Sequence, residues 1–221
     1  MFKTISILSE TENVGKTTTA VNLAVALGLF EKKTLLIDSS TNKNKLLDSL
    51  GIKKSENIIV PTDLQFLQFI GIPFDKPEFL NSNFFNNIDD SFDYIIINSP
   101  NIENKYYDFI LTATDWIIIP FELKQKLLND LYRLVANLKE QSKDHNYSYK
   151  LDGILLNRFN GDHDFNIDIF EKDNIFFNSK IPTFDNIYDN VFFSDIKSNI
   201  SGAYLDFAIE IIEKTSIKEI K

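Results

Sequence analysis

The sequence has no cysteine in its 221 residues. Disulfides, thiolate zinc sites, cysteine-ligated iron–sulfur clusters and cysteine nucleophiles are therefore excluded. Histidine is almost as scarce: His145 and His163 both lie among Lys, Asp and Asn residues, a setting more typical of the surface than of a metal site. With 43% hydrophobic residues the chain has a globular composition and room for one substantial core. We expect a single domain over residues 1–221.

Long apolar runs are also missing. No run approaches the ~20 residues that cross a bilayer, and the N-terminal MFKTISIL lacks the extended apolar stretch of a signal peptide. The final EKTSIKEIK has only Ile217 and Ile220 as apolar residues, which is too little area for a membrane-binding helix. The sequence thus predicts a cytoplasmic protein with no membrane partner.

Positive charge is in short supply. The net charge is −9, and Arg133 and Arg158 are the only arginines. Eight acidic residues stand against two lysines between Asp162 and Asp195, and Lys197 is the clearest basic candidate after them. Because affinity for nucleic acid comes largely from cations that neutralise phosphates, nonspecific DNA binding is disfavoured.

Continuous apolar runs alternate with helical patterns along the chain. The expected strands are 4–8, 34–38, 94–100, 116–120 and 153–157, with at least one more in 57–61 or 64–73 and another in 175–182. The expected helices are 17–30, 123–143 and 203–214. Two strand runs end in proline, which we expect to stop the ladder. Runs without alternation are typical of strands buried on both faces, so we predict a doubly wound α/β domain, a mostly parallel central sheet with helices on both faces.

The segment VGKTT, Val14 to Thr18, follows the first expected strand and opens the first expected helix. This is the context of a phosphate-binding loop, where backbone N–H groups and the helix dipole attract anions. Gly15 would let the backbone approach a phosphate, Lys16 would reach the β- and γ-phosphates, and the Thr17 hydroxyl would ligate Mg²⁺. The simpler alternative is that a threonine of this segment only caps the helix.

Six blocks in a fixed order carry a family resemblance: VGKTTTAVNLAVALG, KTLLIDSS, FDYIIINSPN, ILTATDWIIIPFE, GILLNRF and GAYLDFAIEII. They resemble the ParA/MinD family of dimerising P-loop ATPases, which position plasmids, chromosomes, division sites and other cargo. The resemblance covers nearly the whole chain. It implies a deviant Walker A fold of the SIMIBI type, ATP or ADP with Mg²⁺ as cofactors, a homodimer, and a protein partner that is ParB-like or another regulator.

Three positions depart from the family pattern. The family loop reads KGGVGKTT, and its first lysine reaches across the dimer; here that position is Thr11, followed by Glu12 and Asn13 in place of two glycines. Ser40 stands where the family has the second aspartate of DxDPQ, and Asn98 stands where it has the aspartate after the Walker B strand. Each change removes a charge that would act on the phosphoryl group, water or metal. No catalytic residue is assigned, and the changes predict weak or absent hydrolysis.

Asp38 matches the first aspartate of that family motif, so Thr17 and Asp38 are the predicted Mg²⁺ residues. Glu10 and Glu12 would oppose nucleotide binding only if their carboxylates point inward, where one charge at ~6 Å from a phosphate would repel it by roughly 3 kcal/mol. The loop is also similar to the TDTEVGKT type of dethiobiotin synthetase, which tolerates acidic residues there.

Asn157 and Arg158 stand at the end of the expected strand 153–157. In the family an Asn in this context contacts adenine, and an amide can donate to and accept from a purine edge; the alternative is an ordinary turn residue. The predicted nucleotide-binding residues are thus Asn13, Val14, Gly15, Lys16, Thr17, Thr18, Asn157 and Arg158. We expect a nucleotide-dependent dimer switch that partitions or positions DNA or cellular cargo. The alternatives are a nucleotide-free pseudo-ATPase scaffold and a dethiobiotin-synthetase-like enzyme.

Overall fold

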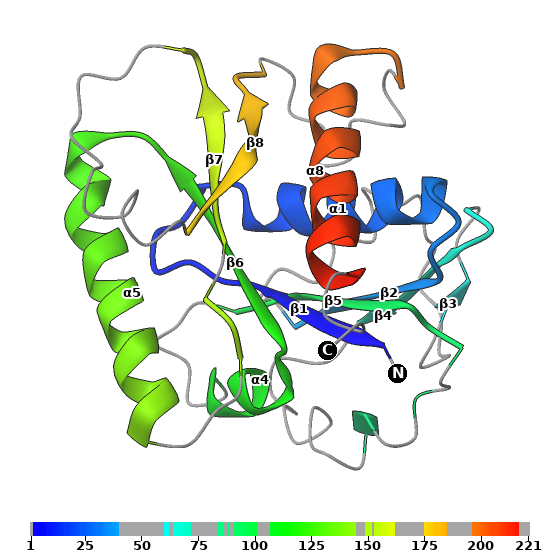
Figure 1. The fold of residues 1–221 in the computed structure, drawn as a ribbon, viewed down its shortest axis with the longest axis horizontal. Helices are drawn as coiled ribbons and strands as arrows, with labels where there is room; N and C mark the ends of the chain where they lie inside the picture. Colours follow the sequence, from blue (N-terminus) through cyan, green and yellow to red (C-terminus); the bar gives the residue numbers. More distant parts are fainter. Residues whose placement is uncertain are drawn as a thin grey trace.

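A computed structural model describes residues 2–39, 60–61, 64–71, 84–85, 88, 91–100, 107–144, 149–151, 153–161, 175–184 and 196–216 (Figure 1). Its strands are β1 Lys3–Ile7, β2 Thr34–Asp38, β3 Val60–Pro61, β4 Leu67–Gly71, β5 Tyr94–Asn98, β6 Trp116–Glu122, β7 Ile154–Phe159 and β8 Phe176–Pro182. Its helices are α1 Lys16–Leu29, α4 Tyr107–Ala113, α5 Gln125–Asp144 and α8 Asn199–Ser216. Ser40 and both histidines lie outside the described residues, as do the acidic stretches 162–174 and 185–195.

The strands form one sheet in the order β3-β4-β2-β5-β1-β6-β7-β8. All neighbouring pairs are parallel except β3 with β4, which is antiparallel. The predicted doubly wound, mostly parallel sheet is confirmed. Strand β1 lies between β5 and β6. The strands β2 to β5 lie on one side of β1, and the chain then crosses to β6 on the other side. A ligand site is expected at the carboxyl ends of strands at such a switch point.

Two hydrophobic cores cover the two faces of the sheet. Along β5, Ile96 packs in the core that contains α1 and α8, while Ile95 and Ile97 pack in the core that contains α4 and α5. The same alternation occurs along β6, where Ile118 faces the first core and Ile117 the second. Figure 1 shows α5 on the opposite side of the strands from the α1–α8 pair. Burial on both faces explains why these strands are apolar up to their last residues, Asn98 and Glu122.

Two details differ from the sequence expectations. The short helix α4 was not anticipated, because its seven residues include little helical periodicity. Strand β6 also continues through Pro120 to Glu122, so the expectation that this proline ends the ladder was wrong. The N–H of Ile119 points toward β7, where it donates to the Gly153 carbonyl at 2.7 Å. The nitrogen of Pro120 therefore faces the β1 side, beyond the last β1–β6 pair at Ile118, and no ladder bond is lost.

Strand register places the candidate site. Asp38 at the end of β2 is level with Asn98 at the end of β5, and Asn98 is level with Ile7 at the end of β1. The segment after β1 therefore begins beside these two polar side chains. Both are buried, with 2% of Asp38 and none of Asn98 exposed.

The edge strand β8 is joined to α8 through Glu210. Its carboxylate, only 8% exposed, accepts hydrogen bonds from the N–H groups of Asn178 and Ser179 at 2.9 Å each and from the Ser179 hydroxyl at 2.8 Å. We expect Glu210→Ala to lower the free energy of unfolding by about 2–3 kcal/mol, because donors to a charged acceptor lose their partner. Thermal unfolding would show a midpoint lower by about 5–10 °C in a chain of this size.

Glu213→Ala is the matched control for this prediction, since Glu213 is exposed on the same helix. Its effect should stay within about 0.5 kcal/mol. Equal midpoints for the two variants would contradict a structural role for the Glu210 carboxylate.

Candidate functional site

The segment between β1 and α1 has the backbone of a loop that cradles an anion. Gly15 is the N-cap of α1 with φ 96°, and Asn13 has φ 60°, so both lie in the left-handed region. A Cβ on Gly15 would come within 2.1 Å of the Asn157 Nδ2 atom, which leaves no room for a side chain. The alternative that a threonine caps the helix is wrong, because the cap is Gly15 and no side chain of the described residues caps this end. The start of α1 is thus left open to an anion.

Lys16 is the first residue of α1, and its side chain folds back over the loop. Its Nζ donates to the Ser9 carbonyl at 3.3 Å. Burial lowers the pKa of Lys16 from 10.5 to about 8, and the nearby carboxylate of Glu12 opposes that shift. The ammonium is still mostly protonated at neutral pH, so it can pair with a phosphate there.

Glu10 does not point into the loop. Its Oε2 accepts hydrogen bonds from Arg133 of α5, at 2.9 Å from Nε and 2.8 Å from an NH2 group. The same guanidinium also contacts Asp130 at 3.2 Å. The paired carboxylate of Glu10 is therefore directed toward α5, whereas Glu12 is exposed at the loop and close enough to influence Lys16.

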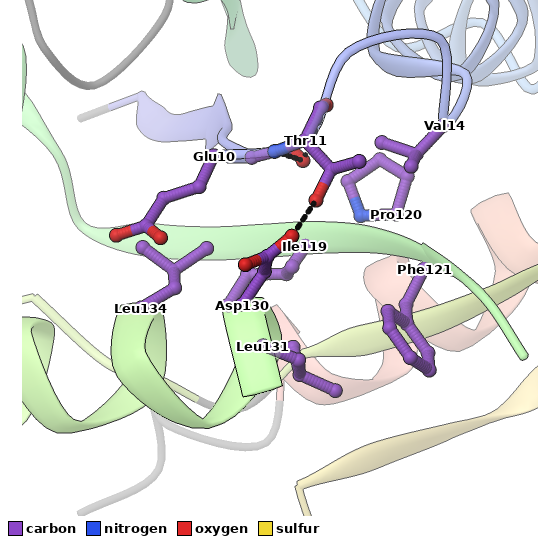
Figure 2. Close-up of a pocket in the computed structure, with 10 residues that line it drawn as sticks. Glu10, Thr11, Val14, Ile119, Pro120, Phe121, Asp130, Leu131 and Leu134 are labelled. Atoms are coloured by element: carbon purple, nitrogen blue, oxygen red, sulfur yellow. Dashed lines mark hydrogen bonds between the residues drawn. The ribbon is translucent and has the colours of Figure 1, made fainter. Parts of the chain in front are cut away.

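Thr11 also faces α5. Its hydroxyl donates to the Asp130 carboxylate at 3.4 Å, as Figure 2 shows, and its backbone is held by two bonds with Ser9 at 2.9 and 3.0 Å. A small cavity lies between the loop, β6 and α5, lined by Ser9, Glu10, Thr11, Val14, Ile119, Pro120, Phe121, Asp130, Leu131 and Leu134. Its volume of about 10 Å³ is about what one water molecule needs, so it is not a nucleotide pocket.

Thr17, Asp38 and Asn98 meet beneath the start of α1. The Asn98 Nδ2 donates to Asp38 Oδ1 at 2.9 Å and to Thr17 Oγ1 at 3.4 Å. The structure thus brings together the two predicted metal residues, with the Asn98 carboxamide between them. The position of Ser40 lies outside the described residues.

Asn157, in the second half of β7, packs directly against the loop. Its Nδ2 donates to the Val14 carbonyl at 2.8 Å, and its Oδ1 accepts from the Arg158 N–H at 3.0 Å. Arg158 adopts φ 52°, in the left-handed region, and its side chain lies 3.4 Å from Glu122 of β6. Both residues are therefore at the same edge of the sheet as the loop, with Asn157 buried and Arg158 exposed.

The other predicted binding residues lie along the same turn. Val14 is buried, Asn13 is exposed, and Thr18 is partly exposed in the first turn of α1, where its carbonyl accepts from Asn22 at 2.7 Å. The eight predicted nucleotide-binding residues therefore form one continuous group at the carboxyl ends of β1 and β7.

Sequence reasoning missed Arg133 and Asp130. They lie on α5, more than 110 positions from the loop residues that they contact, so no local motif includes them. A signal was available in composition: an acidic loop needs a nearby cation, and the chain has only two arginines. Both arginines in fact lie at this edge of the sheet.

The residues fit a nucleotide phosphate. Gly15 in the left-handed region, the N-terminus of α1 and the protonated Lys16 lie together, and a side chain at position 15 would collide with Asn157. No cluster of three His, Cys, Asp or Glu side chains in the described part of the chain could hold a metal alone. Magnesium is usually held by one or two protein groups plus phosphate oxygens, so this absence is compatible with it. The N–H groups that Asn98 directs at Asp38 and Thr17 are less favourable to a cation.

Within the described residues, no helix is long and apolar enough to cross a bilayer.

A parallel sheet in this order, with a glycine-lysine-threonine loop between β1 and α1, defines a P-loop nucleotide-binding fold. Residues 5–199 match the CobQ/CobB/MinD/ParA nucleotide binding domain, and the chain belongs to this family. This match confirms the ParA/MinD resemblance seen in the sequence.

Known proteins similar to this chain include partition proteins. The chromosome partitioning protein ParA of Myxococcus xanthus is 28% identical over 183 residues, which cover 70% of this chain and 64% of that protein, slightly less than two thirds of its length. The sporulation initiation inhibitor protein Soj of Bacillus subtilis is 26% identical over 82% of each chain. The septum site-determining protein MinD of Pyrococcus horikoshii, complexed with Mg-ADP, superposes with a TM-score of 0.80 over 99% of each chain at 20% identity. The last likeness establishes the fold alone.

Proposed function

We propose that this chain is a ParA-like nucleotide-binding protein that acts as a nucleotide-dependent dimer switch in partitioning or positioning DNA or cellular cargo. Its ligand is ATP or ADP. Lys16 and the backbone of residues 13–18 bind the phosphates, and Asn157 and Arg158 lie on the base side. Thr17 and Asp38 are the residues that would face a Mg²⁺ ion bound with the nucleotide.

The observation that carries this proposal is the outward turn of Glu10. The acidic loop was the main objection to phosphate binding, and the Glu10 carboxylate is instead paired with Arg133 at 2.8 Å. Lys16 stays directed over the loop, with its Nζ on the Ser9 carbonyl. The similar MinD structure is a complex with Mg-ADP, which supports a nucleotide as the ligand.

Weak or absent hydrolysis follows from the side chains at two positions. Thr11 carries no charge and is directed at Asp130 of its own chain, so it does not supply a cation to a partner's phosphates. Asn98 supplies no negative charge beside Asp38. Electrostatic stabilisation of the transferring phosphoryl group is a large part of such catalysis, and both changes reduce it. The dimer would then form with ATP and dissociate slowly. A protein partner, either ParB-like or another regulator, would act on this dimer.

Titration with a fluorescent ATP or ADP analogue tests the binding step. We expect saturable binding by the wild type and a loss of about 10- to 100-fold in affinity for Lys16→Ala, because a hydrogen bond to a charged group is removed. Lys139→Ala is the matched control, since it removes the same charge from an exposed position of α5. Equally weak binding by wild type and Lys16→Ala would reject the proposal and favour a nucleotide-free scaffold.

The switch and the hydrolysis are measured separately. Sedimentation with ATP, with ADP and without nucleotide reports the oligomeric state, and phosphate release from ATP reports turnover. A monomer in every nucleotide state would reject the dimer switch while leaving nucleotide binding intact.

A further inference from the structure

The cluster of Thr17, Asp38 and Asn98 is bridged by an amide. Asn98 is fully buried and in register with Asp38 on the neighbouring strand. A carboxamide nitrogen carries two hydrogens. Both are accounted for, one by Asp38 Oδ1 at 2.9 Å and the other by Thr17 Oγ1 at 3.4 Å.

The orientation of this amide is determined by its neighbour. If the amide were rotated by half a turn, its oxygen would face the Asp38 carboxylate, and two acceptors would repel each other. With the nitrogen on Asp38, the Asn98 Oδ1 is buried and has no hydrogen-bond partner among the residues that the structure describes. Asn98 therefore directs only donors at Asp38 and Thr17.

A cation near Thr17 would meet these donors. Mg²⁺ requires oxygen lone pairs in near-octahedral positions at about 2.0–2.1 Å, and the positive ends of N–H bonds directed at the same oxygens oppose it. An aspartate at position 98 would have the reverse effect, because two carboxylates about 3 Å apart repel and a cation between them relieves the repulsion. The amide supplies one of the two Asp38 carboxylate oxygens, Oδ1, with a hydrogen-bond donor without any ion.

We propose that the Asn98 carboxamide takes over the bridging that a Mg²⁺ ion would provide, so that nucleotide binding by this chain is nearly independent of Mg²⁺. This inference rests on the proposed function, since it concerns the same loop. It predicts that Asn98→Asp converts a site that does not require a metal into one that does.

The first measurement needs no nucleotide. Thermal unfolding of the wild type should be unaffected by millimolar Mg²⁺, because Asn98 already donates to Asp38 Oδ1 and Thr17 Oγ1. Asn98→Asp should unfold at a lower temperature in EDTA and recover part of the loss in Mg²⁺. Asn137→Asp adds the same charge at an exposed position of α5 and should respond to neither. A wild-type midpoint that rises with Mg²⁺ while Asn98→Asp does not would overturn the proposal.

The second measurement is the affinity for a fluorescent ADP analogue in Mg²⁺ and in EDTA. Wild type should differ by less than about threefold between the two, and Asn98→Asp by about tenfold or more in favour of Mg²⁺. A wild-type affinity that falls about tenfold in EDTA would overturn this inference and leave the proposed function standing. No binding by the wild type in either solution would overturn both. The wild-type comparison decides the point even if Asn98→Asp fails to fold.

Discussion

Gly15→Ala should abolish nucleotide binding, with a loss of more than about 100-fold in affinity, equivalent to about 2.7 kcal/mol. Alanine at φ 96° carries backbone strain of about 1–2 kcal/mol. Its Cβ would also lie 2.1 Å from the Asn157 Nδ2 atom and push that amide away from the Val14 carbonyl. The loop and the end of β7 would both move, so the phosphate cradle and the proposed base contact are lost together. Titration with a fluorescent nucleotide measures the effect.

Gly161→Ala separates the two causes. Gly161 has a similar φ of 88°, but a Cβ there would meet nothing within 4 Å. It should lose about 1–2 kcal/mol of stability from the strain and keep its affinity for nucleotide. Gly15→Ala should lose more stability, about 2–4 kcal/mol, because the collision adds to the strain. Unchanged affinity in Gly15→Ala would mean that phosphate does not approach this backbone.

The sheet was predictable because its strands are buried on both faces. Runs such as Tyr94–Ile97 of β5 are apolar and buried at every position, which favours a parallel sheet, and β5 pairs in parallel on both sides. Short elements were not predictable in this way. The helix α4 has seven residues, too few to show a helical period, and β3 has two. Their existence depends on the tertiary packing around them.

The loop side of the candidate site was also predictable, since strand, glycine, lysine and helix follow one another in the sequence. Register then explains why Asp38 and Asn98, 60 positions apart, meet through a hydrogen bond. The contacts of Glu10 and Thr11 could not be predicted, because their partners Arg133 and Asp130 lie on α5, which follows the loop only after five further strands, β2 to β6. The sequence left open whether the carboxylates point inward, and the pairing of Glu10 with Arg133 could only be seen in three dimensions.

Gly153→Ala should destabilise the fold strongly, with a loss of about 3 kcal/mol in the free energy of unfolding. A Cβ at this position would lie 2.3 and 2.6 Å from two ring atoms of Phe177 and 2.9 Å from the Ile117 carbonyl oxygen. The ring cannot move easily, because Phe177 is 2% exposed and packs edge-on against Phe207 with centroids 4.8 Å apart. Urea unfolding measures the loss, and the midpoint temperature should fall by about 6–12 °C in a chain of this length.

Gly202→Ala is the same chemical change, and we expect it to raise the free energy of unfolding instead of lowering it. Gly202 lies in α8, a Cβ there would meet nothing within 4 Å, and alanine should stabilise the helix by about 0.5–1 kcal/mol. A double variant locates the cause of the Gly153 effect: with Phe177→Leu present, the added methyl group has more room, and Gly153→Ala should lose less than it does alone. Strict additivity of the two substitutions would show that the collision with the ring is not the source of the loss, because residues in contact are expected to couple. The loss would then be attributed to the contact of the added Cβ with the Ile117 carbonyl oxygen of β6.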